Sequence, residues 1–220
     1  ERGERAKPKP GCYKLWLLVQ GSRGDVQPIL ALAVAARKAG WVVRLLASEE
    51  SRAFVESYGI DFSPVGFDII SDKARKTEHS DLSEEELRKN YQENQKEMLN
   101  EMVASVWSTD ALIDLAGQLV EEAERAREAD DLPDALFFHP LAGSGAYLLW
   151  AKYRFPIYMV DFVCAPLSSD ADLLGYMHQM AEQHGPLLKT RFGADPFEGW
   201  DDKRMLDWKR DRTITCASRL

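Results

Sequence analysis

The stretch "YKLWLLVQGSRGDVQPILALAVAARKAGWVVRLLA" (residues 13–47) decides the fold class. It opens with a short apolar run, 13–19, which ends at a glycine-containing loop and therefore predicts a buried strand. A helical pattern follows over 28–40, with apolar residues at helical spacing. Pro28 suits a first helical turn and Gly40 suits a C-terminal cap. A strand followed by a helix is the first half of a crossover unit.

The residues that follow repeat this alternation. The apolar run 41–47 predicts a second strand, and 48–59 predicts a helix with Ser48 as its N-cap. The run 60–66 predicts a third strand. Strand–helix alternation with crossovers of this length is typical of a parallel sheet with helices on both faces. We therefore predict an α/β, Rossmann-like fold.

The remaining residues continue the pattern with less regularity. We predict helices over 83–106 and from 109 or 110 to 127, strands over 134–140, 155–161 and 213–218, and a loop and helix over 141–154. The predicted organisation is a flexible, solvated tail over 1–12 and one Rossmann-like domain over 13–220, in which 162–212 is less regular.

Composition excludes several classes of function. The formal net charge of −8 disfavours a nucleic-acid partner, because phosphate binding needs a basic surface. The three cysteines, Cys12, Cys164 and Cys216, are far apart and predict neither a disulfide framework nor a metal site. A reducing, intracellular compartment is expected, cytoplasmic or organellar after processing, with peripheral membrane association left open. The apolar runs are shorter than the roughly 20 residues of a membrane-spanning helix.

The loop "GSRGD" (21–25) allows three interpretations: a phosphate cradle, a catalytic carboxylate or a tight turn. It lacks the third glycine of the dinucleotide fingerprint and the lysine of the phosphate loop, so neither nucleotide motif fits. Gly21 and Gly24 allow positive φ and close backbone approach. Asp25 can cap the N-terminus of the following helix or act as a general base, and the two roles are compatible.

Two longer segments carry a resemblance to a known family. They are "GSRGDVQPILALAVAARKAGWVVRLLASEESRAFVESYGIDFSPVG" (21–66) and "DALFFHPLAGSGAYLLWAKYRFPIYMV" (134–160). Together they resemble the N-terminal domain of the family 28 glycosyltransferases, above all the sterol 3-β-glucosyltransferases and the enzymes that glycosylate antibiotic aglycones. The first segment contains the family's G-[ST]-R-G-D-V-Q-P loop, whereas the second matches more loosely.

The resemblance implies one half of a GT-B fold, in which two Rossmann-like domains face each other across a cleft. The N-terminal domain holds the acceptor and the C-terminal domain holds the nucleotide sugar, usually UDP-glucose. The resemblance makes Asp25 the base that deprotonates the acceptor hydroxyl, with inversion at the anomeric carbon. Gly21, Ser22, Arg23 and Gly24 would line the cleft. No cofactor is expected, because the UDP-sugar donor would bind a domain that this chain lacks, and the chain alone is expected to be inactive.

Further residues are placed at the same edge of the sheet. His139 lies at the end of the fourth predicted strand, where it either touches acceptor or donor or is satisfied by the backbone. Gly143 and Ser144 belong to a glycine-rich turn beside it, over 141–145. Asp161 follows the fifth predicted strand. Three aromatic residues either line an apolar acceptor pocket or belong to the core: Phe162, Tyr176 and Trp200.

Two functions remain open. The first is an acceptor-binding domain of a UDP-sugar-dependent glycosyltransferase that acts on a sterol or another lipophilic alcohol, with the C-terminal domain or a protein partner supplying the rest. The second is a non-catalytic structural or interaction subunit of a larger assembly, organellar or membrane-associated, that derives from such a domain. Retention of the fold does not decide between them.

Overall fold

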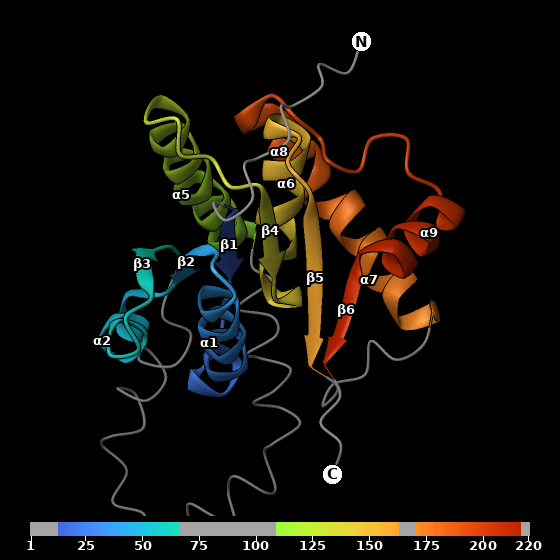
Figure 1. The fold of residues 1–220 in the computed structure, drawn as a ribbon. Helices are drawn as coiled ribbons and strands as arrows, with labels where there is room; N and C mark the ends of the chain where they lie inside the picture. Colours follow the sequence, from blue (N-terminus) through green and yellow to red (C-terminus); the bar gives the residue numbers. More distant parts are fainter. Residues whose placement is uncertain (1–12, 67–108, 163–169, 217–220) are drawn as a thin grey trace, which may run out of the picture.

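The computed structural model describes residues 13–66, 109–162 and 170–216 of the 220-residue chain. The strands are β1 (Lys14–Leu18), β2 (Val42–Ala47), β3 (Asp61–Pro64), β4 (Ala135–Phe138), β5 (Ile157–Phe162) and β6 (Thr213–Cys216). The helices are α1 (Arg23–Lys38), α2 (Arg52–Glu56), α5 (Thr109–Glu128), α6 (Gly143–Tyr153), α7 (Asp170–Gln183), α8 (Gly185–Phe192) and α9 (Asp202–Arg212) (Figure 1).

The strands form one six-stranded parallel sheet in the order β3-β2-β1-β4-β5-β6. Leu18, at the end of β1, pairs with Leu46 of β2 on one side and with Phe138 of β4 on the other. The strand order reverses between β1 and β4, which makes this pair the topological switch point. Ligands of open α/β sheets bind outside the carboxyl ends of the strands at such a point.

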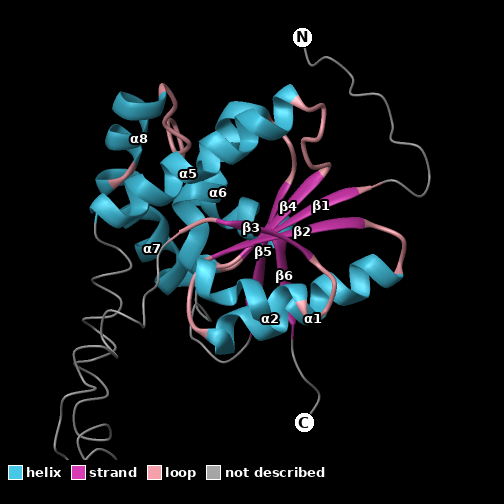
Figure 2. Cartoon of the chain, turned by 90° about the vertical axis from the view of Figure 1, so that its left-hand side faces the viewer, coloured by secondary structure: helices cyan, strands magenta, loops and turns pink. Residues whose placement is uncertain are grey.

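Helices cover both faces of the sheet, as predicted (Figure 2). Trp16 and Leu18 of β1 point into the larger core, which α5, α6, α7 and α9 complete. Leu15 and Leu17 point to the other face, where α1 and α2 cover them. All four side chains are at most 2% exposed. Burial on both faces explains why β1 reads as one continuous apolar run.

Helix α1 begins at Arg23 and not at Pro28, so its predicted start is wrong. Ser22 is the N-cap, and Ser22 and Asp25 form a capping box that satisfies backbone donors of the first turn. Pro28 lies inside the helix and has no N–H to donate. At the other end Gly40 has a φ of 92° just beyond the C-cap residue Ala39, as a C-terminal glycine should.

Other boundaries differ from the prediction in informative ways. The segment 48–59 contains a 3₁₀ turn, Glu49–Ser51, before the short helix α2, and the Ser48 side chain makes no capping hydrogen bond. The stretch predicted as less regular contains the three helices α7, α8 and α9. Helix α5 confirms the prediction that a helix starts at 109 or 110. The predicted helix over 83–106 and the tail over 1–12 lie outside the described residues.

Within the described part of the chain, none of the helices is both long and apolar enough to cross a membrane.

Candidate functional site

The loop between β1 and α1 holds Asp25 by two hydrogen bonds to Ser22. Asp25 Oδ2 accepts from the Ser22 backbone N–H (2.7 Å) and from Ser22 Oγ (2.9 Å). The Ser22 hydroxyl in turn accepts from the Gly24 backbone N–H (3.1 Å). The predicted capping role of Asp25 is therefore confirmed, whereas its catalytic role stays a prediction.

Gly21 is required for this arrangement. Its φ of 137° is a conformation that residues with a side chain rarely adopt. A Cβ atom at this position would lie 2.3 Å from Asp25 Oδ2, well inside van der Waals contact. Any other residue at position 21 would push the Asp25 carboxylate out of its place.

The second oxygen of Asp25 faces a histidine from the neighbouring strand. Asp25 Oδ1 lies 3.9 Å from Nε2 of His139, which directly follows β4. The His139 backbone N–H donates to the carbonyl of Leu18 (2.9 Å), so the parallel pairing of β1 and β4 sets the position of the imidazole. The Asp25 side chain is 33% exposed and that of His139 is 15% exposed.

This pair can exchange protons with a bound molecule. An ionised carboxylate with one oxygen held by Ser22 keeps lone pairs on the other oxygen for a hydroxyl proton. Imidazole is the side chain whose ordinary pKa lies nearest neutrality, so it gives or takes a proton readily. Asp25 and His139 therefore place acid–base groups at the switch point of the sheet.

Two glutamines, one after β1 and one on α5, form hydrogen bonds with the two residues that follow β3. Gln20, which is 1% exposed, donates from Nε2 to the Val65 carbonyl (2.8 Å). Gly66 donates its N–H to Oε1 of Gln118 on α5 (2.7 Å). A Cβ at Gly66 would lie 2.1 Å from the Gln20 amide. The residue that precedes the "GSRGD" loop is thus fixed to the carboxyl end of β3.

The other predicted residues of the loop turn outward. Arg23 is exposed, and its guanidinium carbon lies 4.3 Å from the centre of the Phe54 ring of α2. This is a cation–π contact across the two helices that cover one face of the sheet. Gly24 is exposed in the first turn of α1.

Gly143 and Ser144 do not join the Asp25–His139 pair. Both are buried in the first turn of α6 rather than in an open turn. Ser144 is 2% exposed, and its hydroxyl lies 3.0 Å from Nδ1 of His184 and 3.3 Å from the sulfur of Met180. Burial lowers the pKa of His184, because the interior disfavours the charged imidazole.

Asp161 lies in β5, near its carboxyl end, where its backbone pairs with Thr215. The side chains of Asp161, Phe162 and Tyr176 lie outside the part that the structure describes. Trp200 packs against the larger core and contacts the ring of Tyr147, with 6.0 Å between the ring centres. For Trp200 the prediction of a core position is confirmed.

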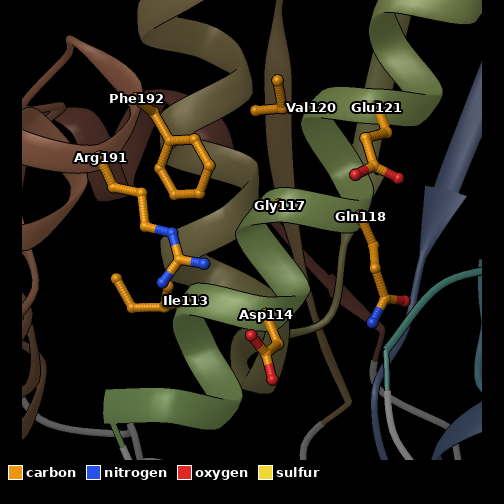
Figure 3. A pocket seen from close by; sticks show the side chains of 8 residues that line it. All are labelled: Ile113, Asp114, Gly117, Gln118, Val120, Glu121, Arg191 and Phe192. Carbon is orange, nitrogen blue, oxygen red and sulfur yellow. The ribbon is translucent and has the colours of Figure 1, made fainter.

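A hollow of about 490 Å³ lies between α5 and α8, where the sequence pointed to no site. Figure 3 shows the side chains that line it: Ile113, Asp114, Gly117, Gln118, Val120, Glu121, Arg191 and Phe192. The glycine inside the apolar pattern of α5 was the local signal that could have found it. Among the described residues no group of three or more His, Cys, Asp and Glu side chains could hold a metal ion.

Parts of the chain are similar in sequence to known proteins. Residues 15–125 match the model of the Glycosyltransferase family 28 N-terminal domain. The sterol 3-beta-glucosyltransferase UGT80B1 of Arabidopsis thaliana is 46% identical over 55 residues, which are 25% of this chain and 9% of that protein. The sterol 3-beta-glucosyltransferase of Yarrowia lipolytica is 34% identical over 115 residues, 49% of this chain and 8% of that protein.

Solved structures match over a longer part of the chain. The Streptomyces sp. SF2575 glycosyltransferase SsfS6 has a TM-score of 0.53 at 20% identity and covers 80% of this chain, which matches 46% of that one. The calicheamicin glycosyltransferase CalG4 has a TM-score of 0.54 at 15% identity, covering 92% of this chain and 47% of its own. The chain thus spans just under half of these structures and less than a tenth of the two curated relatives.

Proposed function

The chain belongs to glycosyltransferase family 28, whose N-terminal domain it matches, and its sheet forms one half of a GT-B fold. We propose that residues 13–220 bind the acceptor alcohol of a glycosyl transfer and that Asp25 removes the proton of its hydroxyl. The observation that carries the proposal is the geometry of the Asp25 carboxylate. Its Oδ2 is held by Ser22, while its Oδ1 faces His139 at 3.9 Å at the switch point of the sheet.

The proton transfer follows from this geometry. As the alcohol oxygen attacks the anomeric carbon, its proton passes to Oδ1 of Asp25. The new C–O bond forms on one face of the sugar while the bond to the nucleotide diphosphate breaks on the other, and the leaving group takes the electron pair. The configuration of the anomeric carbon is inverted. The imidazole of His139, 3.9 Å away, lies beside the oxygen that takes the proton.

A sterol or similar lipophilic alcohol is the acceptor that we propose. This is supported by the curated relatives, all named sterol 3-beta-glucosyltransferase, although each matches only part of the chain. We infer that the donor is a UDP-sugar presented by a facing half, because this chain matches just under half of the solved glycosyltransferases. Holding two reactants together supplies much of the rate of such a reaction.

The test measures glucose transfer from radiolabelled UDP-glucose to ergosterol or sitosterol by the longest protein that the gene encodes. Asp25→Asn keeps the size of the side chain but removes its basicity, so kcat should fall by about 10²–10⁴-fold while the KM for the sterol changes little. The matched control is Asp211→Asn, which alters an exposed aspartate at the end of α9 and should keep full activity. Retention of kcat in Asp25→Asn would contradict the role of this residue.

A second arm tests the division of labour between the two halves. The 220-residue chain alone should bind the sterol but transfer no glucose. Transfer by this chain alone would contradict the need for a facing half. If the longest protein folds and still transfers no sugar from any donor tested, the non-catalytic subunit becomes the better interpretation.

A further inference from the structure

The hollow between α5 and α8 has the size of a small-molecule site and shares no residue with the Asp25 loop. Its volume of about 490 Å³ lies within the range of about 300–1,000 Å³ found for ligand pockets. Phe192 and Arg191, at the end of α8, extend toward α5 and form one wall, while α5 forms the floor (Figure 3). The hollow therefore lies between two helices of the layer that covers one face of the sheet.

Gly117 keeps this hollow open. It lies in the middle of the 20-residue helix α5, where glycine destabilises a helix by about 0.5–1 kcal/mol relative to alanine. Packing does not demand a glycine here, because a Cβ would meet only the ring of Phe192, at an ordinary 3.9 Å. Because residue 117 has no side chain, the surface of α5 has a gap there, and the ring of Phe192 lies opposite this gap.

The charged groups around the hollow have no partners within the described residues, in contrast to others on the same helix. Glu122 and Glu124 of α5 form ion pairs with arginines. Asp114 and Glu121, which line the hollow, make neither an ion pair nor a side-chain hydrogen bond in the described part of the chain, and the same holds for Arg191. Two exposed carboxylates and one exposed guanidinium thus line the same hollow as the half-buried ring of Phe192.

This combination selects a class of ligand. The two carboxylates disfavour binding of an anion, and the guanidinium disfavours binding of a cation. A neutral polyol suits both, because its hydroxyls donate to carboxylates and accept from arginine in charge-assisted hydrogen bonds. A pyranose ring also has an apolar C–H face that can pack on Phe192. We propose that the hollow binds a neutral carbohydrate of one or two pyranose rings.

One end of the hollow is held rigidly. Gln118 uses its Oε1 to accept the N–H of Gly66, which fixes this side chain to the carboxyl end of β3. Ile113 is 9% exposed, and Val120 packs with Phe192 against the same small apolar cluster. A site whose walls are already ordered loses little entropy on binding.

The test titrates the isotope-labelled 220-residue chain with cellobiose, maltose and methyl β-D-glucopyranoside up to about 50 mM, followed by amide NMR. We expect at least one sugar to bind with a dissociation constant of about 1–10 mM. The shifted amides should lie in residues 113–121 and 191–192. Absence of any saturable shift with all three sugars would overturn the proposal, and so would shifts confined to 21–25 and 139.

Two variants separate binding in the hollow from adsorption elsewhere. Gly117→Leu fills the hollow and should weaken binding at least tenfold. Its matched control is Gly175→Leu, the same change at an exposed glycine of α7 with open space around it, which should bind as the parent does. Arg191→Gln, at an exposed side chain, should weaken binding several-fold without changing the fold. Unchanged affinity in both Gly117→Leu and Arg191→Gln would refute the site.

Discussion

Two turns follow neighbouring strands at the same edge of the sheet, one from β1 into α1 and one from β4 into α6. Each contains a glycine–serine pair, "GSRGD" at 21–25 and "GSG" at 143–145. In the first turn Ser22 and the half-exposed Asp25 bond to each other and present a carboxylate oxygen toward His139. In the second, Ser144 is 2% exposed and bonds to His184 inside the protein.

Similar sequences that follow neighbouring strands therefore have different physical roles in the two turns. Gly21 is needed for its positive φ, which leaves room for Asp25. Gly145 has ordinary helical geometry and is needed for its lack of a side chain, because α6 approaches α5 closely there. The first turn positions an ionisable group, and the second turn packs two helices. Three substitutions and one change of pH test this contrast between the two turns.

The largest effect is expected for Gly145→Ala. The new Cβ would lie 2.3 Å from Cδ1 of Leu119, a fully buried side chain. Forcing a methyl group into a packed core lowers the free energy of unfolding by about 1–3 kcal/mol. Urea denaturation measures it. Gly175→Ala, at an open position of α7, should instead raise the free energy of unfolding by about 0.5–1 kcal/mol. Equal effects of the two changes would show that the second turn is not tightly packed.

Ser144→Ala is expected to have the next largest effect. It removes the hydroxyl that lies 3.0 Å from Nδ1 of the buried His184. A buried polar group left without its partner costs about 1–3 kcal/mol of unfolding free energy. Thermal denaturation, analysed with the calorimetric enthalpy, gives this value. A loss below about 0.5 kcal/mol, typical of surface positions, would mean that the Ser144–His184 contact is dispensable.

Acid should weaken the second turn through His184. Burial lowers its pKa below the ordinary value of 6.5, so the unfolded chain binds a proton that the folded chain does not. The stability that depends on neutral His184 is complete above a pH of about 6.5 and decreases below it, by up to about 1.4 kcal/mol per pH unit. Urea titrations between pH 7.5 and pH 5 measure the slope. His184→Gln should flatten it, and an unchanged slope would assign the acid sensitivity to other groups.

The smallest change in stability is expected for Ser22→Ala in the first turn. It removes the side-chain acceptor of the Gly24 N–H and one of the two hydrogen bonds of Asp25. Loss of an N-cap costs about 1 kcal/mol of unfolding free energy. The amide signals of residues 23–26 should shift in NMR spectra while those around Ser144 stay in place. A shift around Ser144 as well would mean that the two turns are coupled.

Much of the fold was predictable because it depends on patterns of neighbouring residues in the sequence. Short apolar runs alternating with helical periodicity predicted the parallel α/β sheet, and the six-stranded sheet confirms it. The start of α1 at Arg23 was missed although its signal was present, since Ser22 and Asp25 have the spacing of a capping box. The "GSRGD" loop was predicted to join the first strand to this helix, whereas its last three residues, 23–25, already form the first turn of the helix. Its catalytic role stays a prediction.

The rest of the candidate site was not predictable from local patterns. Asp25 and His139 meet only because β1 and β4 are neighbours in the sheet, and strand order depends on how distant segments pack. Ser144 was predicted to line a cleft on the basis of its glycine-rich neighbours. It is buried instead, in contact with Met180 of α7 and with His184, the residue that directly precedes α8. The hydrophobic periodicity of the sequence predicts neither the meeting of Asp25 with His139 nor the burial of Ser144.

The α/β class, the family and the chemical groups available at the edge of the sheet could be inferred from the amino-acid sequence. Hydrophobic periodicity and turn residues act over a few neighbouring positions, so they can be read from one segment at a time. Which of the two similar turns presents a carboxylate, and which is buried, became visible in the folded structure. That choice depends on which helices cover each turn, and helix packing joins residues that are distant in the chain.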